Sequence, residues 1–436
     1  MEFYNLISFL GIFILLGIAW LLSADKKVMN WRLVSLGIAI QMLFALVIFK
    51  FPPGGKAFLW INDVVVEILE TASAGAQFVF GRLALPPGSV NDAGEQSLGF
   101  FLAFQAFPTI IFFSALMSIL YFVGIMPIII RGFAYVFTRF MRISGAESLC
   151  AASNIFVGVE STLTIKPQLE KLTRSELTTV LTAGMATVAS NVLAIYVFSL
   201  REHFPTIAAH LISASFLSVP AALIMSKIIM PETETPNTLG THIQPYYIRE
   251  RSLFEAIING ANTAVRLIVG ITALLIAILG LVALIDLVLG GIGGKINSLG
   301  GFEIDWSLSG LLGYVFYPLT LILGVPPADA EIISKILAER MIKTEIPAYH
   351  DLARALAENL LTHKRSAVIC TYALCGFAHV ASLAIFIGGI TSIAPKTVHT
   401  LSRIGLRALI AATLACLMTA CIAGAFYSEG SFLFGG

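Results

Sequence analysis

Charged side chains are scarce in this 436-residue chain. Asp, Glu, Lys and Arg make up 12% of it, while 57% of the residues are hydrophobic. Soluble domains carry about 25% charged residues. The deficit argues against a soluble enzyme, a nucleic-acid-binding protein and a disordered chain, all of which need a more charged surface. With 27 Lys and Arg against 26 Asp and Glu, neither sign dominates, so specificity must come from a defined site.

Motifs for chemistry are also missing. The five cysteines form no Cys-x-x-Cys pair and do not stand beside a histidine at ligand spacing, so we expect them to be small core residues. No His-Glu-x-x-His motif, Walker-type glycine loop or nucleophile and base pair is evident. We therefore expect that the protein is not an enzyme and does not hydrolyse ATP.

Long uncharged apolar runs are present instead. Crossing the hydrocarbon core takes about 20 residues, and eight runs are long enough. A ninth run, 306–323, precedes a charged segment, and we expect it to lie against protein. The sequence thus predicts an all-α polytopic membrane protein with the lipid bilayer as a partner. The eight predicted spans cover approximately residues 3–24, 33–49, 98–126, 177–200, 204–226, 267–285, 366–395 and 408–428.

Basic residues predict the orientation. They follow the first span and flank the polar loop 231–251, so the positive-inside rule places both loops in the cytoplasm and the N-terminus outside. The first run follows Met1-Glu2 without a basic region, which is typical of an anchoring span rather than a cleaved signal peptide. Segments 56–81 and 128–142 are amphipathic, and the first is expected to lie at the membrane interface.

Two segments of the chain match each other. Gly184–Ser190 and Gly376–Ser382 agree at five of seven positions, and each lies in a long apolar span that follows a more polar segment. By the parity of the spans, the two copies enter the membrane from opposite sides. We therefore predict inverted repeats with two re-entrant hairpins and broken transmembrane helices. Transporters bind substrate and ions between such repeats. The alternative is that the small residues merely let helices pack closely.

The predicted domain organisation has four parts. The N-terminal spans and an interfacial helix form a scaffold over 1–97, and a cytoplasmic loop with an amphipathic helix covers 230–266. The repeats are the first over 98–229, with hairpin 127–172 and broken helix 177–200, and the second over 267–428, with hairpin 327–360 and broken helix 366–395.

Two carboxylates occupy corresponding points of the hairpins. Glu160 and Glu345 would each cost at least about 2.5 to 3.5 kcal/mol at membrane depth, so each should face a polar cavity and have a partner. A hydroxyl-rich ligand suits them, because an ionised carboxylate accepts two strong hydrogen bonds from neighbouring hydroxyls. The alternative is a structural ion pair with a nearby Lys or Arg.

Other polar residues lie on the hairpins and broken spans. Asn154 and Thr187 offer neutral oxygens that suit an alkali cation, although both residue types are also common in helix packing. His379 and Ser382 lie on the second broken span. His379 could donate a hydrogen bond to a ligand, take a coupling proton or bridge two helices.

These residues stand in ordered blocks that resemble the concentrative nucleoside transporters over essentially the whole chain. The resemblance implies a homotrimer with eight spans, three interfacial helices and two re-entrant hairpins in each protomer. It also implies elevator-type transport of nucleoside, coupled to sodium or protons. The blocks include Gly145-Ala-Glu-Ser148, Asn154-Ile-Phe-Val-Gly158, Gly184-Met-Ala-Thr-Val-Ala189, Thr344-Glu345 and Leu374-Cys-Gly-Phe-Ala378.

The resemblance also implies roles for individual residues. Two of the sodium ligands would be valines that act through their backbone carbonyls, and Glu345 and Ser382 would face the ribose. The implied sodium ligands are Asn154, Val157, Thr187 and Val188. The implied substrate-binding residues are Gly158, Val159, Glu160, Val192, Glu345, His379 and Ser382.

This chain departs from the family pattern at both hairpin tips. The family usually has Gly-Gln-Thr-Glu-Ala-Pro at the first tip, whereas here Gly158-Val-Glu-Ser-Thr162 is one residue shorter and lacks the proline. The Gln and Thr that would hydrogen-bond the base are absent, and Val159 remains. The other replacements are Thr344 for Asn, Ile346 for Phe, Pro347 for Val and His379 for Asn.

The leading expectation is a cation-coupled nucleoside symporter, with sodium favoured because Asn154 and Thr187 are kept. The expected cofactor is none beyond sodium or a proton as coupling ion. The expected location is the plasma membrane, which is the inner membrane in a Gram-negative bacterium. Two alternatives stay open. One is a proton-coupled symporter of another small polar or ribosyl solute, coupled through His379, and the other is a solute-binding membrane protein that does not transport.

Overall fold

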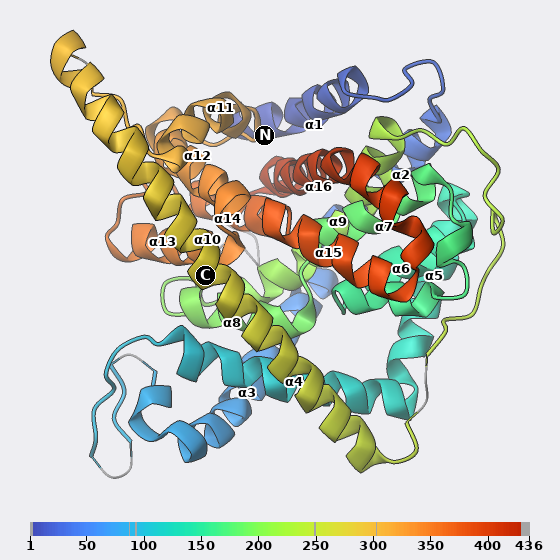
Figure 1. Ribbon diagram of the computed structural model, residues 1–436, viewed down its shortest axis with the longest axis horizontal. Coiled ribbons are helices and arrows are strands. Elements are labelled where there is room, and N and C mark those ends of the chain that lie inside the picture. The colour runs from blue at the N-terminus through green and yellow to red at the C-terminus, as the bar shows by residue number, and fades with distance from the viewer. Residues whose placement is uncertain (1–2, 87, 92–93, 248–249, 302, 429–436) are drawn as a thin grey trace.

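Helices are the dominant secondary structure of the protein. The computed structural model describes residues 3–86, 88–91, 94–247, 250–301 and 303–428, and no β-sheet occurs within these ranges (Figure 1). This confirms the predicted all-α class. The N-terminal part comprises helices α1 (Phe3–Leu21), α2 (Trp31–Phe49) and α3 (Pro52–Phe80), the short helix η1 (Gly81–Ala84), and the π-helix η2 (Leu102–Ala106) that leads into α4 (Phe107–Val123).

Seven helices in the described ranges are long and apolar enough to cross a membrane. The predicted spans 177–200 and 366–395 are not among them, because each is divided into two shorter helices. Segment 52–84 meets the same criteria of length and composition, so its predicted place at the membrane interface stays a prediction. The seven helices cover 3–21, 31–49, 52–84, 102–123, 207–229, 253–300 and 395–426.

Two helices are interrupted at the matching segments of the repeats. Helix α7 (Arg174–Ala186) is separated from α8 (Ser190–Leu200) by three non-helical residues, and α14 (Lys364–Leu374) is separated from α15 (Val380–Ile393) by five. At the second break the His379 side chain accepts a hydrogen bond from the backbone amide of Ser382 and caps α15. Each break leaves helix-terminal amide and carbonyl groups facing the protein interior.

The two hairpins differ in regularity. The first runs from α6 (Gly145–Ser153) into the 3-10 helices η3 (Val159–Ile165) and η4 (Leu169–Lys171), whereas the second consists of α12 (Pro327–Ile342) and α13 (Glu345–Ala357). In η3 the hydroxyls of Thr162 and Thr164 donate to the carbonyls three residues before them. Such side-chain bonds compete with α-helical bonding, which accounts for the tighter second arm.

Helix α10 (Leu253–Gly300) corrects one predicted boundary. The amphipathic helix expected within 230–266 is not separate, because α10 starts at Leu253 and continues for 48 residues. Ser252 caps its start by accepting from the amide of Glu255, and no proline interrupts it. In Figure 1 this helix crosses the face of the molecule diagonally and extends beyond the other helices at its C-terminal end.

Two amphipathic helices precede the hairpins. Gly124, in the left-handed conformation with φ of 89°, ends α4 and lets the chain turn into α5 (Ile125–Met141). The corresponding helix of the second repeat is α11 (Leu308–Ile322), which covers the ninth apolar run. It packs against α12 and α1, so it lies against protein in the described structure.

The core is built around α9 (Ile207–Ile229) and α16 (Val398–Phe426). Many of their buried residues are small, such as Ala221, Ala222, Ala411 and Ala415, so the two helices approach each other closely. Polar contacts join the core helices as well. The Tyr372 hydroxyl of α14 lies 2.5 Å from Ser213 Oγ and 3.1 Å from His210 Nδ1, both on α9.

Helices α1 and α2 contact this core chiefly through α16 and α9, while α3 and α4 lie to one side of it (Figure 1). The predicted scaffold role of 1–97 concerns which helices stay fixed during movement, and it stays a prediction.

A buried ion pair fixes the first hairpin to the core. Lys227 Nζ of α9 lies 2.6 Å from Glu147 Oε1 of α6 and 3.3 Å from Glu232 Oε2. Both Lys227 and Glu147 are almost inaccessible to solvent. Removing the cation would leave a buried carboxylate uncompensated, which typically costs about 3 to 5 kcal/mol.

We therefore expect Lys227→Met to lower the melting temperature of the purified protein markedly. Lys396→Met is the matched control, because the pair between Lys396 and Glu170 is exposed and such pairs contribute about 1 kcal/mol or less. Thermal unfolding followed by tryptophan fluorescence measures both variants. Equal melting temperatures for the two would show that the buried pair does not stabilise the hairpin.

Candidate functional site

The first hairpin tip meets the first helix break. A Cβ atom built on Gly158 would lie 3.4 Å from the Cβ of Ala189, which is ordinary van der Waals contact. The second break lies against the first: a Cβ on Gly376, whose φ is 143°, would lie 2.9 Å from the carbonyl oxygen of Ala186. Glycine is therefore required there both by its backbone conformation and by the close approach.

A small cavity of about 90 Å³ lies between both tips, both broken helices and α10. It brings together all seven residues predicted for substrate binding. They are Gly158, Val159 and Glu160 from the first hairpin, Val192 from α8, Glu345 from the second tip, and His379 and Ser382 at the second break. Two carboxylates 185 positions apart in the sequence thus line one internal space.

Glu345 is held by neighbours from both repeats. The Tyr196 hydroxyl of α8 donates to Glu345 Oε1 at 2.7 Å, and His379 Nε2 lies 2.8 Å from Glu345 Oε2. The Tyr349 ring stacks on that of Tyr196 with centroids 4.4 Å apart, which fixes the donor. In this structure His379 therefore bridges from the second break to the second hairpin tip. This corresponds to the predicted role in which His379 bridges two helices.

Glu160 lies on the boundary of two cavities. It lines the small central cavity and also a neighbouring cavity of about 350 Å³, together with Val157, Tyr121 and Tyr247. In the described part of the chain neither Glu160 nor Glu345 forms an ion pair with a lysine or arginine. The alternative of a structural ion pair with such a residue is therefore not what the structure shows.

The four predicted sodium ligands lie behind the central cavity. Asn154, Thr187 and Val188 are buried and do not line it, and Val157 faces the neighbouring cavity. The Asn154 side-chain oxygen accepts from Ser161 Oγ at 2.8 Å, and the Thr187 hydroxyl donates to the Ala183 carbonyl at 2.9 Å. Both oxygens keep a free lone pair, which a cation could use.

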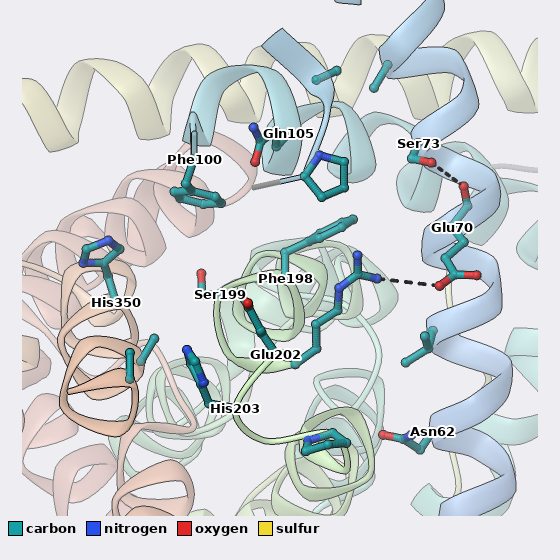
Figure 2. Close-up of a pocket in the computed structure, with 18 of the residues that line it drawn as sticks. Asn62, Glu70, Ser73, Phe100, Gln105, Phe198, Ser199, Glu202, His203 and His350 are labelled. Carbon is teal, nitrogen blue, oxygen red and sulfur yellow. Dashed lines mark hydrogen bonds and ion pairs between the residues drawn. The ribbon is translucent and has the colours of Figure 1, made fainter. Parts of the chain in front are cut away.

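A larger hollow of about 920 Å³ lies elsewhere, between α3 and the second hairpin. Figure 2 shows Asn62 and Glu70 on α3 at one side of it and His350 of α13 at the other. Arg201 also lines this hollow, and its Nη1 lies 3.9 Å from Glu70 Oε1. Of the described residues that line it, none was predicted to bind substrate or sodium.

Sequence reasoning missed other residues that line the central cavity. The apolar residues on α10 look like any lipid-facing stretch, so no pattern could have identified them. Phe377 could have been found, because it lies in the block Leu374–Ala378 that carries the family resemblance. The missed residues are Ala189, Leu267, Ile271, Leu274, Leu275, Thr344, Ile346, Phe377, Ile385 and Phe386.

Three family models match successive parts of the chain. The Na⁺ dependent nucleoside transporter N-terminus matches residues 10–83, the nucleoside recognition (Gate) model matches 103–202, and the Na⁺ dependent nucleoside transporter C-terminus matches 210–424. An uncharacterized transporter of Haemophilus influenzae is 36% identical over 97% of this chain and 98% of its own length. The chain belongs to the concentrative, Na⁺ dependent nucleoside transporter family.

Other members of this family are larger or have solved structures. Solute carrier family 28 member 3 of Mus musculus is 37% identical over 96% of this chain, but the chain spans only 58% of that relative. Structures of CNTnw cover 98% of both chains, with a TM-score of 0.87 in an inward-facing substrate-bound state and 0.85 in an outward-facing state. Their sequence identities are 32% and 30%.

Family membership and these structural matches confirm the predicted fold with its hairpins and broken helices. They also make this chain a multi-pass membrane protein of a transporter family and not an enzyme.

The geometry predicts which cavity admits solutes. The five native cysteines are buried and should not react with N-ethylmaleimide. A cysteine introduced by Leu163→Cys, at a 43% exposed position in the 350 Å³ cavity beside Glu160, should react quickly. A cysteine introduced by Val192→Cys, which is 4% exposed in the central cavity, should react slowly. Mass spectrometry of the labelled protein measures both rates, and faster labelling at position 192 would contradict the closed cavity.

Proposed function

We propose that this protein is a sodium-coupled nucleoside symporter. The observation that carries the proposal is the shared cavity lined by Glu160 and Glu345, which come from the tips of two hairpins in opposite repeats. Carboxylates in such a cavity suit the hydroxyls of a sugar. The family's description supports nucleoside as substrate and sodium as coupling ion.

Substrate would compete for contacts that the protein now makes with itself. Both oxygens of Glu345 are engaged, one by Tyr196 and one by His379, so ribose hydroxyls would replace or share these partners. Phe377 and Phe386 line the same cavity and offer aromatic faces for a base. A base could thus be held by stacking, without the Gln and Thr that the first tip lacks.

The size of the cavity supports movement during transport. Ligand pockets usually enclose about 300 to 1,000 Å³, whereas the central cavity holds about 90 Å³. A nucleoside would enter only if the hairpin tips separated or α10 moved away. The 350 Å³ cavity beside Glu160 is also lined by Tyr246 and Tyr247 of the predicted cytoplasmic loop. This favours entry or release of substrate on the cytoplasmic side.

For sodium, we propose Asn154 and Thr187 as side-chain ligands, with Val157 and Val188 as backbone ligands. Asn154 caps α6 at the first hairpin tip, and Thr187 follows the end of α7, two helices that pack together. The C-terminal end of α7 carries partial negative charge, which attracts a cation. Bound sodium would join the hairpin tip to the break and so prepare the cavity for substrate.

The finer features remain part of the proposal. We propose a homotrimer in the plasma membrane, the inner membrane in a Gram-negative cell, that works by an elevator movement. The largely exposed apolar surface of α10, with Ile276, Leu281 and Leu287 each at least 60% exposed, supports a helix that faces lipid or other protomers.

A second candidate is favoured by the contact between His379 and Glu345. A histidine paired with a carboxylate can carry a proton, so this pair could couple transport of a different ribosyl or polar solute to protons. A protein that binds solute without moving it is the third candidate, and it predicts saturable binding without counterflow.

Replacing Glu345 tests the substrate site. Charged hydrogen bonds contribute about 1.5 to 3 kcal/mol, so we expect Glu345→Gln to raise the KM for uridine uptake into proteoliposomes by roughly tenfold to a hundredfold. Glu331→Gln is the control, because Glu331 lies on the outer surface of the same hairpin, where it pairs with Lys335. Uridine uptake by Glu345→Gln equal to that by the control would contradict the substrate site.

Replacing Asn154 tests the ion site. We expect Asn154→Ala to raise the sodium concentration for half-maximal uptake by roughly fivefold or more, since coupling between an ion site and a substrate site is typically about 1 to 3 kcal/mol. Asn259→Ala, at an exposed position of α10, should leave it unchanged. Uptake that persists in choline and follows a pH gradient would instead support the proton-coupled candidate.

A further inference from the structure

Arg340 is a buried cation of the second hairpin that forms no ion pair with a described carboxylate. It lies in the last turn of α12, the first arm of the second hairpin, and is fully buried. Its Nη1 donates to the carbonyl oxygen of Ala373 at 2.5 Å. Its Nε and Nη2 have no hydrogen-bond partner among the described residues, and no carboxylate lies within ion-pair distance there.

The other buried cations are compensated more fully. Lys227 has two carboxylates, and Arg365 donates to Gly324, Asn5, Tyr4, Ser8 and Gly424. A buried charge without such compensation is strongly unfavourable. One carbonyl acceptor and the nearby Cys416 thiol do not compensate the charge of Arg340 unless its surroundings supply negative potential.

The end of α14 supplies that potential. Ala373 is the penultimate residue of α14, and the last carbonyls of a helix carry about half a negative charge. Two of the other terminal carbonyls already have partners. Thr371 accepts from the Tyr349 hydroxyl and the Cys375 amide, and Tyr372 also accepts from that amide. Arg340 therefore adds its positive charge to the C-terminal cap of α14.

In the first repeat, no described lysine or arginine donates a hydrogen bond to the corresponding helix end. Helix α7 ends at Ala186, where the Thr187 hydroxyl donates to Ala183 and the Cys416 thiol lies 3.8 Å from the Ala186 carbonyl. Asn154 caps the first arm of its hairpin, just as Arg340 occupies the last turn of the first arm of the other. The half-helix of the first repeat is thus left for a mobile ion.

We propose that Arg340 is a fixed internal cation that does in the second repeat what sodium does in the first. It neutralises the C-terminal end of the broken helix and locks the second hairpin to it. Arg340 is a positioning residue, since it does not line the substrate cavity. The parallel with sodium rests on the proposed function, but the requirement for positive charge at position 340 does not.

The test uses three variants of the full chain, purified in detergent and unfolded thermally in choline chloride without nucleoside. Arg340→Met should lower the melting temperature by about 5 °C or more. Arg340→Lys, which keeps the charge, should recover most of that loss. Lys335→Met, an exposed cation on the same helix, should match the wild type. Millimolar guanidinium should raise the melting temperature of Arg340→Met and not that of the wild type.

Several outcomes would overturn the proposal. They are an Arg340→Met variant as stable as the wild type, an Arg340→Lys variant as damaged as Arg340→Met, or both variants failing to fold. If only Arg340→Met fails to fold, the requirement for charge is supported. A sodium titration of the wild type separates this result from the proposed function. If sodium does not stabilise the wild type, or stabilises Asn154→Ala equally, the proposed sodium site is wrong. The melting temperatures in choline still decide the role of Arg340.

Discussion

Lipid offers no hydrogen-bond partner, so every polar group at membrane depth must find one within the protein. The two broken helices create the largest demand of this kind, because each break leaves terminal amides and carbonyls inside the molecule. The rest of the structure is arranged around them. The hairpin tips approach the breaks, α16 packs across both, and the Cys416 thiol contacts carbonyls of both, at Ala186 and Cys375.

Different groups pair with the terminal carbonyls at the two breaks, and this asymmetry is central to the proposed mechanism. In the second repeat Arg340, Tyr349 and the Cys375 amide cap the end of α14 permanently. In the first repeat the described side chains at the end of α7 are the Thr187 hydroxyl, which donates to the Ala183 carbonyl, and the Cys416 thiol, 3.8 Å from the Ala186 carbonyl. A site that is complete only with an ion can couple ion binding to substrate binding, whereas a permanently capped one can serve as a rigid support.

The candidate substrate site follows from the same geometry. Gly376 permits the second break to lie close against the first, and the first hairpin tip contacts the first break where Gly158 meets Ala189. That approach brings Glu160 and Glu345 to one cavity and leaves Glu345 paired with His379 and Tyr196. The pairs stabilise the charge when no ligand is present, and they can be exchanged for ligand hydroxyls without exposing a bare carboxylate to an apolar interior.

The resemblance to the family implied the seven predicted residues that line the central cavity. The amino-acid sequence by itself determined the membrane class, the repeated unit, the broken spans and the two hairpin carboxylates. It could do so because apolar length, repeated small-residue motifs and buried carboxylates each have a direct physical meaning. Only the tertiary structure decided that α10 is one continuous helix, that Phe386 and the α10 residues reach the cavity, and that Arg340 faces a helix end. Each of these depends on contacts between segments far apart in the chain, and local composition does not encode which helix face meets which neighbour.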